Sequence, residues 1–201
     1  ANGTMVSDSA SVGNAAPAIF SDEFTNLSNW TVTRLTLDQG TGSPGAPSAR
    51  AQVTAQSAFA TRSLGQTVPQ VCMSMSVNVT TQGGTAIDLL RLRTAANGPV
   101  AKVYLNASGI LLVRSDVSGT QQSSSTAIGT GWHEIELCGT VGAAGTWDLY
   151  RDGTKIVNAF AANTGTTPVG LIQIGDNAAR TMTVNFDHVR VDQSPGEGSP
   201  P

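Results

Sequence analysis

The sequence has few charged residues, few aromatic residues and no long apolar run, and each shortage excludes a class of protein. Charged side chains are 12% of the chain, the formal net charge is -3, and no basic cluster stands out. The electrostatic footprint of a nucleic-acid-binding protein is therefore missing. No apolar stretch approaches the roughly 20 residues of a membrane helix, so we expect no insertion into a membrane. Aromatic residues are only 5%, which argues against a flat aromatic strip that binds crystalline polysaccharide.

What the chain has instead is the composition of strands and turns. It contains 22 glycines, abundant Thr, Ser and Ala, and no sustained 3.6-residue period. The Asp152-Gly153 pair between two alternating segments predicts a two-residue hairpin, because both central positions need a positive φ. We expect strands over residues 19–24, 30–35, 53–62, 71–79, 88–94, 101–106, 110–115, 133–141, 146–151, 154–160, 170–175 and 183–192. Short strands separated by such turns predict an all-β sandwich or barrel.

The ends of the chain differ from its middle. Residues 1–17 are small and polar and read as a leader or linker, and residues 193–201 are a Pro/Gly/Ser-rich segment typical of an extended linker. We therefore predict one sandwich domain over residues 18–192, monomeric and tethered through 193–201 to a further domain.

The two cysteines are predicted to pair. Cys72 alternates with Val71 and Met73, and Cys138 alternates with Leu137, so both thiols lie on the polar face of their strands. An exposed free thiol is open to oxidation, and a bond between neighbouring strands removes it. Such a bond implies an oxidising compartment; the alternative is two unrelated surface cysteines.

Four segments together resemble the concanavalin A-like lectin/glucanase superfamily, which includes laminin G-like modules. They are residues 19–24 with Trp30, residues 131–137, residues 147–153 and residues 186–191. The resemblance implies a two-sheet antiparallel jelly-roll sandwich. It says little about function, because this fold hosts lectins, hydrolases, lyases and adhesion modules.

The last predicted strand changes its alternation at Asp187-His188. Val184 and Phe186 share one face, yet so do Val189 and Val191, and a β-bulge at this point accounts for the change. Asp187 then becomes a carboxylate among apolar residues, which requires a partner.

Calcium is one such partner, since it takes hard oxygen ligands. The resemblance implies a structural calcium held between the first and last strands. It makes Asp187 the carboxylate ligand, Glu23 a contributor through its carbonyl, and the glycine-rich loop 40–45 a source of a further carbonyl. The alternative is that Asp187 pairs with an arginine or is exposed.

No catalytic motif is found, and we predict no catalytic residues. Glycoside hydrolases of family sixteen carry a Glu-x-Asp-x-x-Glu pattern, whereas Glu134 and Glu136 are followed by no third acidic residue. The pattern predicts that these two glutamates are solvent-exposed residues on the polar face of an amphipathic strand. Arg91 and Arg93 resemble the Arg-rich strand of alginate-lyase-like jelly rolls, but the Gln-x-His strand of those enzymes is absent. No histidine spacing fits a catalytic zinc site.

Five residues are candidates for a sugar-binding groove. Tyr104 and Tyr150 alternate with apolar residues and therefore face out of the core. If their strands belong to one concave sheet, a single groove could be lined by Tyr104, Tyr150, Arg91, Arg93 and Glu136. The alternative is that outward tyrosines only cover their neighbours.

Taken together, these features predict a non-catalytic, lectin-like carbohydrate-binding module of a secreted or cell-surface multi-domain protein, with a polysaccharide or glycan as its partner. Two alternatives stay open. One is a divergent glycoside hydrolase or polysaccharide lyase, and the other is an adhesion or spacer module.

Overall fold

A computed structural model describes residues 18–193 except 44 and 46. The described residues form strands and turns and no helix, and none of them could cross a lipid bilayer as a helix. The strands are β1 (Phe20–Asp22), β2 (Thr31–Thr33), β3 (Leu35–Asp38), β4 (Ser48–Val68), β5 (Gln70–Gln82), β6 (Ile87–Thr94), β7 (Pro99–Leu105), β8 (Ile110–Ser115), β9 (Gln121–Ala127), β10 (Trp132–Thr140), β11 (Gly145–Arg151), β12 (Thr154–Ala162) and β13 (Val169–Asp192). The all-β prediction is confirmed. The expected leader 1–17 and residues 194–201 of the expected linker lie outside the described residues.

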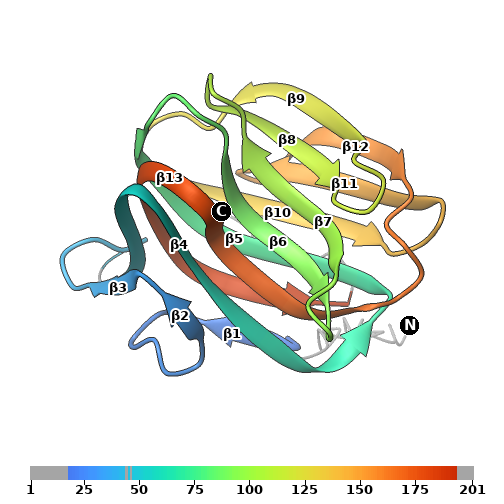
Figure 1. Cartoon of the computed structure of the whole chain (residues 1–201), viewed down its shortest axis with the longest axis horizontal. Coiled ribbons are helices and arrows are strands. Elements are labelled where there is room, and N and C mark those ends of the chain that lie inside the picture. The colour runs from blue at the N-terminus through green and yellow to red at the C-terminus, as the bar shows by residue number, and fades with distance from the viewer. Residues whose placement is uncertain (1–17, 44, 46, 194–201) are drawn as a thin grey trace, which may run out of the picture.

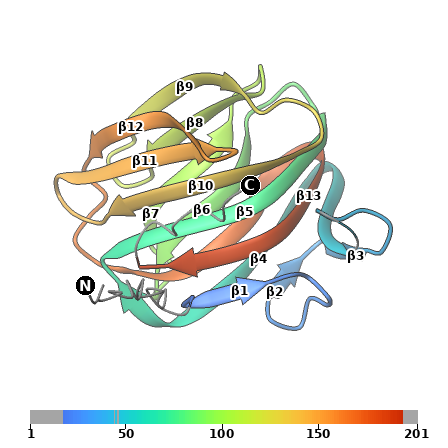
Figure 2. The same cartoon turned by 180° about the vertical axis from the view of Figure 1, so that it is seen from behind.

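The strands make one antiparallel sheet that folds over on itself into two layers (Figures 1 and 2). Its central order is β12-β11-β10-β5-β13-β6-β7-β8-β9. One layer holds β6 to β9, and the other holds β5 and β10 to β12, as the two opposite views show. The predicted antiparallel sandwich is therefore what the chain forms.

Two long strands join the layers. The first part of β13 pairs with β6 and its last part pairs with β5, while β4 follows β13 along both parts. The sequence predicted two separate strands over 170–175 and 183–192, and this prediction was wrong. The pairing continues through the intervening turn-like residues, where Asp176 is fully buried and holds the bend by accepting hydrogen bonds from the Asp88 and Ala178 amides and from Arg180.

The core lies between the layers and follows the predicted alternation. Val71, Met73, Met75 and Val77 of β5 are buried, and they pack with apolar side chains of the other layer in one cluster. The predicted Asp152-Gly153 turn is confirmed, with φ values of 50° and 72°.

The predicted disulfide is also confirmed. Cys72 and Cys138 lie directly opposite each other on β5 and β10, with their Cα atoms 4.1 Å apart. Both lie on the outward face of this layer, beside the inward-facing Ile135 and Leu137 side chains. The bond therefore ties two neighbouring strands from the side opposite the core.

Gly139 is expected to tolerate no side chain. A Cβ atom at this position would collide with the Trp147 ring and the Thr146 carbonyl, and Trp147 is only 1% exposed. The Gly139→Ala substitution should lower the free energy of unfolding by about 1–3 kcal/mol, as overpacking does, in urea denaturation. Gly142→Ala is the matched control, because its Cβ would meet nothing closer than 3.6 Å, and equal stability of the two variants would contradict the prediction.

Candidate functional site

A line of polar residues runs at right angles to the strands across β2, β4, β13 and the outward face of the β6–β9 layer. Directly opposed residues of an antiparallel pair point to the same side, so the strand registers place these side chains in one row. The polar row consists of Thr31, Thr61, Gln173, Arg91, Lys102, Arg114 and Gln121. With strands about 4.8 Å apart, the row is roughly 29 Å long. We call the outward surface made by this row with Arg93, Asp88, Tyr104 and Asp116 the basic face.

Two carboxylates hold three cations of the row in place. Asp88 is only 5% exposed, and its Oδ2 lies 2.6 Å from Arg91 Nη2 while its Oδ1 lies 2.9 Å from Lys102 Nζ. Asp116 lies 3.8 Å from nitrogens of Arg91, Lys102 and Arg114. The three cations thus share two negative charges in a connected network.

Arg93 extends this surface and differs from the other cations. Its Nε donates to Gln173 Oε1 at 3.1 Å and its Nη1 donates to the Asn97 carbonyl at 3.3 Å. Among the described residues no carboxylate lies within 4.0 Å of it, unlike Arg91, Lys102 and Arg114. Burial, followed by the charge of Arg91, lowers the pKa of Arg93, although an arginine stays protonated in proteins. A half-buried, protonated guanidinium without a carboxylate partner among the described residues attracts an anion strongly.

Gln173 fixes the direction in which Arg93 points. Its amide is 1% exposed, and its Nε2 donates to the Gly175 carbonyl at 3.0 Å. That bond sets which amide atom faces Arg93, so Oε1 is the acceptor for Arg93 Nε. With Nη1 bonded to the Asn97 carbonyl, Nη2 is the nitrogen of Arg93 that makes no hydrogen bond to another described residue.

Tyr104 lies on the same face, in register with Asp88. Its hydroxyl donates to Gln121 Oε1 at 2.8 Å, and Lys102 Nζ lies 5.2 Å from its ring centroid. Burial raises its pKa, with Arg114 lowering it and Asp88 raising it further, so the phenol is protonated at neutral pH. The residue is only 9% exposed, which leaves little ring area for stacking against a sugar.

The expected single groove of five residues is corrected by the topology. Arg91, Arg93 and Tyr104 lie together on β6 and β7, but Glu136 and Tyr150 lie opposite each other on β10 and β11. Both point outward from the other layer, whose inward residues are Ile135, Leu137 and Leu149. The five residues therefore occupy two opposite faces of the sandwich, and whether either set binds sugar remains a prediction.

The second set has its own environment. Burial raises the pKa of Glu136, and the charges of Glu134 and Asp192 raise it further. Lys155 Nζ lies 5.3 Å from the Tyr150 ring centroid. This is an acidic surface, in contrast with the basic face.

Sequence reasoning missed several residues of the basic face. Lys102 and Arg114 alternate with buried apolar residues on β7 and β8, and Gln173 stands between Ile172 and Ile174. The alternation gives their outward direction. It does not give the register that lines them up with Arg91.

The predicted β-bulge at Asp187-His188 is present. Asp187 is opposite Ser76 and Arg190 is opposite Ser74, so β13 carries one extra residue there, and His188 has a φ of 46°. Asp187 is 2% exposed as a result.

Backbone amides satisfy Asp187 in place of an arginine. Its Oδ2 accepts from Ser43 N at 2.8 Å and its Oδ1 from His188 N at 2.9 Å. Burial raises its pKa above the usual range, against the effect of these two hydrogen bonds. Glu23 Oε2 lies 2.7 Å from His188 Nε2. A pocket of about 200 Å³ is lined by Glu23, Thr25, Ser43, Gly45, Pro47, Asp187 and His188.

The donor set fits a calcium ion in part. One ligand atom each from Glu23, Asp187 and His188 lie within 4.8 Å of one another, and each Asp187 oxygen keeps a second lone pair. Two carboxylates are the hard oxygen ligands that calcium prefers. The His188 imidazole is not such a ligand, and it competes with a cation for the Glu23 carboxylate.

Comparison with known proteins finds resemblance at the level of structure. No protein-family model and no curated sequence matches the chain. An endo-beta-1,4-glucuronan lyase from the fungus Trichoderma reesei superposes with a TM-score of 0.66 at 11% identity, over 89% of this chain and 96% of the lyase. The cellulose induced protein Cip1 superposes with a TM-score of 0.67 at 15% identity, over 87% of this chain and 97% of Cip1. The likeness is one of fold.

A third neighbour is much longer than this chain. The Trypanosoma rangeli sialidase, solved in complex with sialic acid, superposes with a TM-score of 0.60 at 10% identity, over 82% of this chain but only 27% of the sialidase. These three neighbours support the sandwich fold implied by the resemblance, and they assign no site residue here.

Proposed function

We propose that this protein is a non-catalytic module that binds an acidic polysaccharide along the basic face. The observation that carries the proposal is Arg93, a half-buried guanidinium with no carboxylate partner among the described residues, beside the row of cations. A guanidinium binds a carboxylate through two parallel hydrogen bonds. A polymer with one carboxylate on each sugar matches a line of cations better than an isolated anion does.

The rest of the row suits sugar hydroxyl groups. Gln121 and the threonines Thr31 and Thr61 carry side chains that both donate and accept hydrogen bonds, and they stand at the two ends of the row. Two structural neighbours are named for acidic sugars, a glucuronan in one case and sialic acid in the other. Their fold likeness makes an acidic glycan a reasonable ligand to test first.

The direct test is calorimetric titration with an oligoglucuronate and with the same oligomer after its carboxyl groups are reduced to alcohols. We expect binding of the first only, weakening as salt is raised, because exposed charges are screened over about 8–10 Å at 0.10–0.15 M ionic strength. Equal affinity for the two oligomers would remove the proposal.

A polysaccharide lyase is the second candidate, favoured by Tyr104 lying beside Lys102 and Arg91 on this face. In such a reaction a base removes the C5 proton, a C4–C5 double bond forms as the C4–O bond breaks, and the released oxygen takes up a proton. The raised pKa of Tyr104 keeps its phenol protonated, which disfavours it as that base, so binding without cleavage is preferred. Formation of the ultraviolet-absorbing unsaturated uronate, lost in Tyr104→Phe, would reverse this order.

We also propose that Asp187 and Glu23 hold a structural calcium ion. Adding calcium should raise the thermal midpoint, because a ligand that binds the folded state at one hundred times its Kd stabilises that state by about 2.7 kcal/mol. For a domain of this size, the midpoint should rise by roughly 5–10 °C. EDTA should reverse the shift, and Asp187→Asn should abolish it. Magnesium is the matched control, expected to act weakly because it demands near-ideal octahedral geometry; no shift with calcium would contradict the site.

The disulfide supports a secreted or cell-surface location, since such bonds persist in oxidising compartments. If no glycan binds, the hypothesis of an adhesion or spacer module is favoured. Tethering to a further domain and the monomeric state stay predictions.

A further inference from the structure

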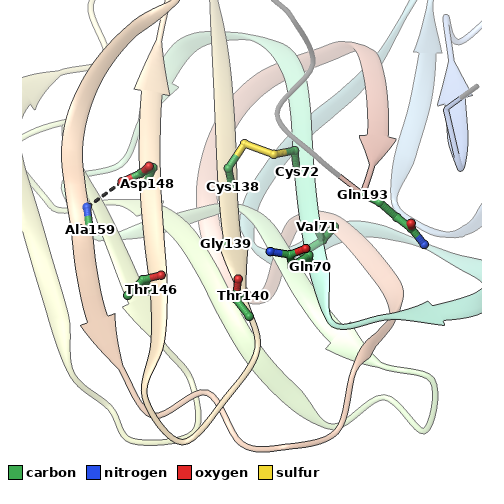
Figure 3. Close-up of a pocket in the computed structure, with 10 residues that line it drawn as sticks. All are labelled: Gln70, Val71, Cys72, Cys138, Gly139, Thr140, Thr146, Asp148, Ala159 and Gln193. Carbon is green, nitrogen blue, oxygen red and sulfur yellow. Dashed lines mark hydrogen bonds between the residues drawn. A yellow bond between two sulfur atoms is a disulfide. The ribbon is translucent and has the colours of Figure 1, made fainter. Parts of the chain in front are cut away.

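A second pocket lies on the face of the sandwich opposite the basic face. Its volume is about 250 Å³, and it is lined by Gln70, Val71, Cys72, Cys138, Gly139, Thr140, Thr146, Asp148, Ala159 and Gln193 (Figure 3). We propose that this pocket binds a single neutral sugar ring. The proposal does not depend on the basic face.

The pocket offers polar side chains without partners over an apolar floor. The side chains of Gln70, Thr140, Thr146 and Gln193 line the pocket and make no hydrogen bond to another described residue. Hydroxyl and amide groups both donate and accept, so they match ligand groups that also do both, and sugar hydroxyls are such groups. The Cys72–Cys138 disulfide, drawn in yellow in Figure 3, lies among them as an apolar surface.

The strand β10 presents Cys138 and Thr140 to the pocket, and Gly139 between them points into the core. Gly139 is opposite Val71 on one side and Trp147 on the other. A Cβ at Gly139 would meet the Trp147 ring in the core, and consecutive residues of a strand point to opposite sides, so Cys138 and Thr140 face the pocket and Gly139 does not.

The charges around the pocket favour a neutral sugar over an acidic one, because the lining contains the carboxylate of Asp148 and no lysine or arginine. Burial raises the pKa of Asp148, but hydrogen bonds from Ala159 N at 2.6 Å and Lys155 Nζ at 2.8 Å outweigh it and lower the pKa below the usual value. Arg190, the other nearby cation, is held by Asp192 at 2.6 Å. Both cations are therefore occupied, while the ionised Asp148 can still accept a hydrogen bond from a ligand hydroxyl.

The size of the pocket limits the ligand. Sites for drug-sized molecules measure about 300–1,000 Å³, and 250 Å³ lies below that range. One sugar ring fits this volume, and a chain of several rings would extend onto the open surface. A ligand this small is expected to bind with a Kd on the order of 1 mM.

The test is a heteronuclear NMR titration of the full chain with glucose, galactose, mannose and xylose as methyl glycosides, and with the methyl glycoside of glucuronic acid. At least one neutral glycoside should shift the Gly139 backbone amide and the Gln70 side-chain amide. The glucuronoside should not shift them. Absence of these shifts with every neutral glycoside, or equal shifts with the glucuronoside, overturns the proposal.

Variants check that the shifts come from this pocket. The triple variant Thr140→Val/Thr146→Val/Gln70→Ala removes three hydrogen-bonding groups and keeps β-branched residues at the two threonine positions. It should weaken binding about tenfold or more. Thr80→Val lies on β5 outside the pocket lining and is the matched control. Unchanged affinity in the triple variant, with an unchanged thermal midpoint, overturns the proposal.

Discussion

Replacing Arg93 by alanine is expected to weaken oligoglucuronate binding by about tenfold to a hundredfold. A hydrogen bond to a charged group contributes about 1.5–3 kcal/mol, and 1.4 kcal/mol corresponds to a factor of ten in affinity. The expected loss is large because Arg93 has no internal carboxylate among the described residues to satisfy it. Its Nη2 makes no hydrogen bond to another described residue and is open to the ligand, whereas Arg91 already pairs with Asp88.

Calorimetric titration of three further variants makes the test specific. Arg93→Lys keeps the charge but loses the planar fork, so it should recover only part of the affinity. Gln173→Ala removes the acceptor that directs Arg93 and should weaken binding less than Arg93→Ala. Arg190→Ala, on the opposite face, should bind like the wild type. Wild-type affinity in Arg93→Ala would place the ligand elsewhere.

Removing the disulfide is expected to cause the largest loss of stability. The bond joins residues 66 positions apart, and a loop of this length is worth about 4 kcal/mol in the chain-entropy description. The Cys72→Ala/Cys138→Ala variant should therefore unfold roughly 8–16 °C lower than the wild type. Differential scanning calorimetry measures the difference.

A reductant distinguishes loss of the bond from loss of packing. It should lower the midpoint of the wild type toward that of the double variant and leave the variant unchanged. A wild-type midpoint that does not move on complete reduction, shown by thiol titration, would mean that the folded strands alone hold β5 and β10 together.

Several features of this protein follow from local sequence patterns. Alternation on β5 and β10 identified the inward residues and put Cys72 and Cys138 on the outward face. The change of alternation at Asp187-His188 identified the bulge. Each pattern involves only residues on one strand, where neighbouring side chains point to opposite sides.

Other features required the whole fold. The polar strand β9 (Gln121–Ala127) has no apolar alternation, and it is a strand because it pairs with β8. Segments 170–175 and 183–192 look like two strands, but pairing with the 21-residue strand β4 makes them one.

The candidate sites show the same division most clearly. The sequence alone determined that Arg91, Arg93, Tyr104, Glu136 and Tyr150 point away from the core. Only the tertiary structure decided that the first three share a face with Lys102 and Gln173, and that Glu136 and Tyr150 lie on the other layer beside the disulfide pocket. Alternation records the side of a strand that a residue occupies, whereas its neighbours on that side are set by register and layer, which arise from pairing between distant segments.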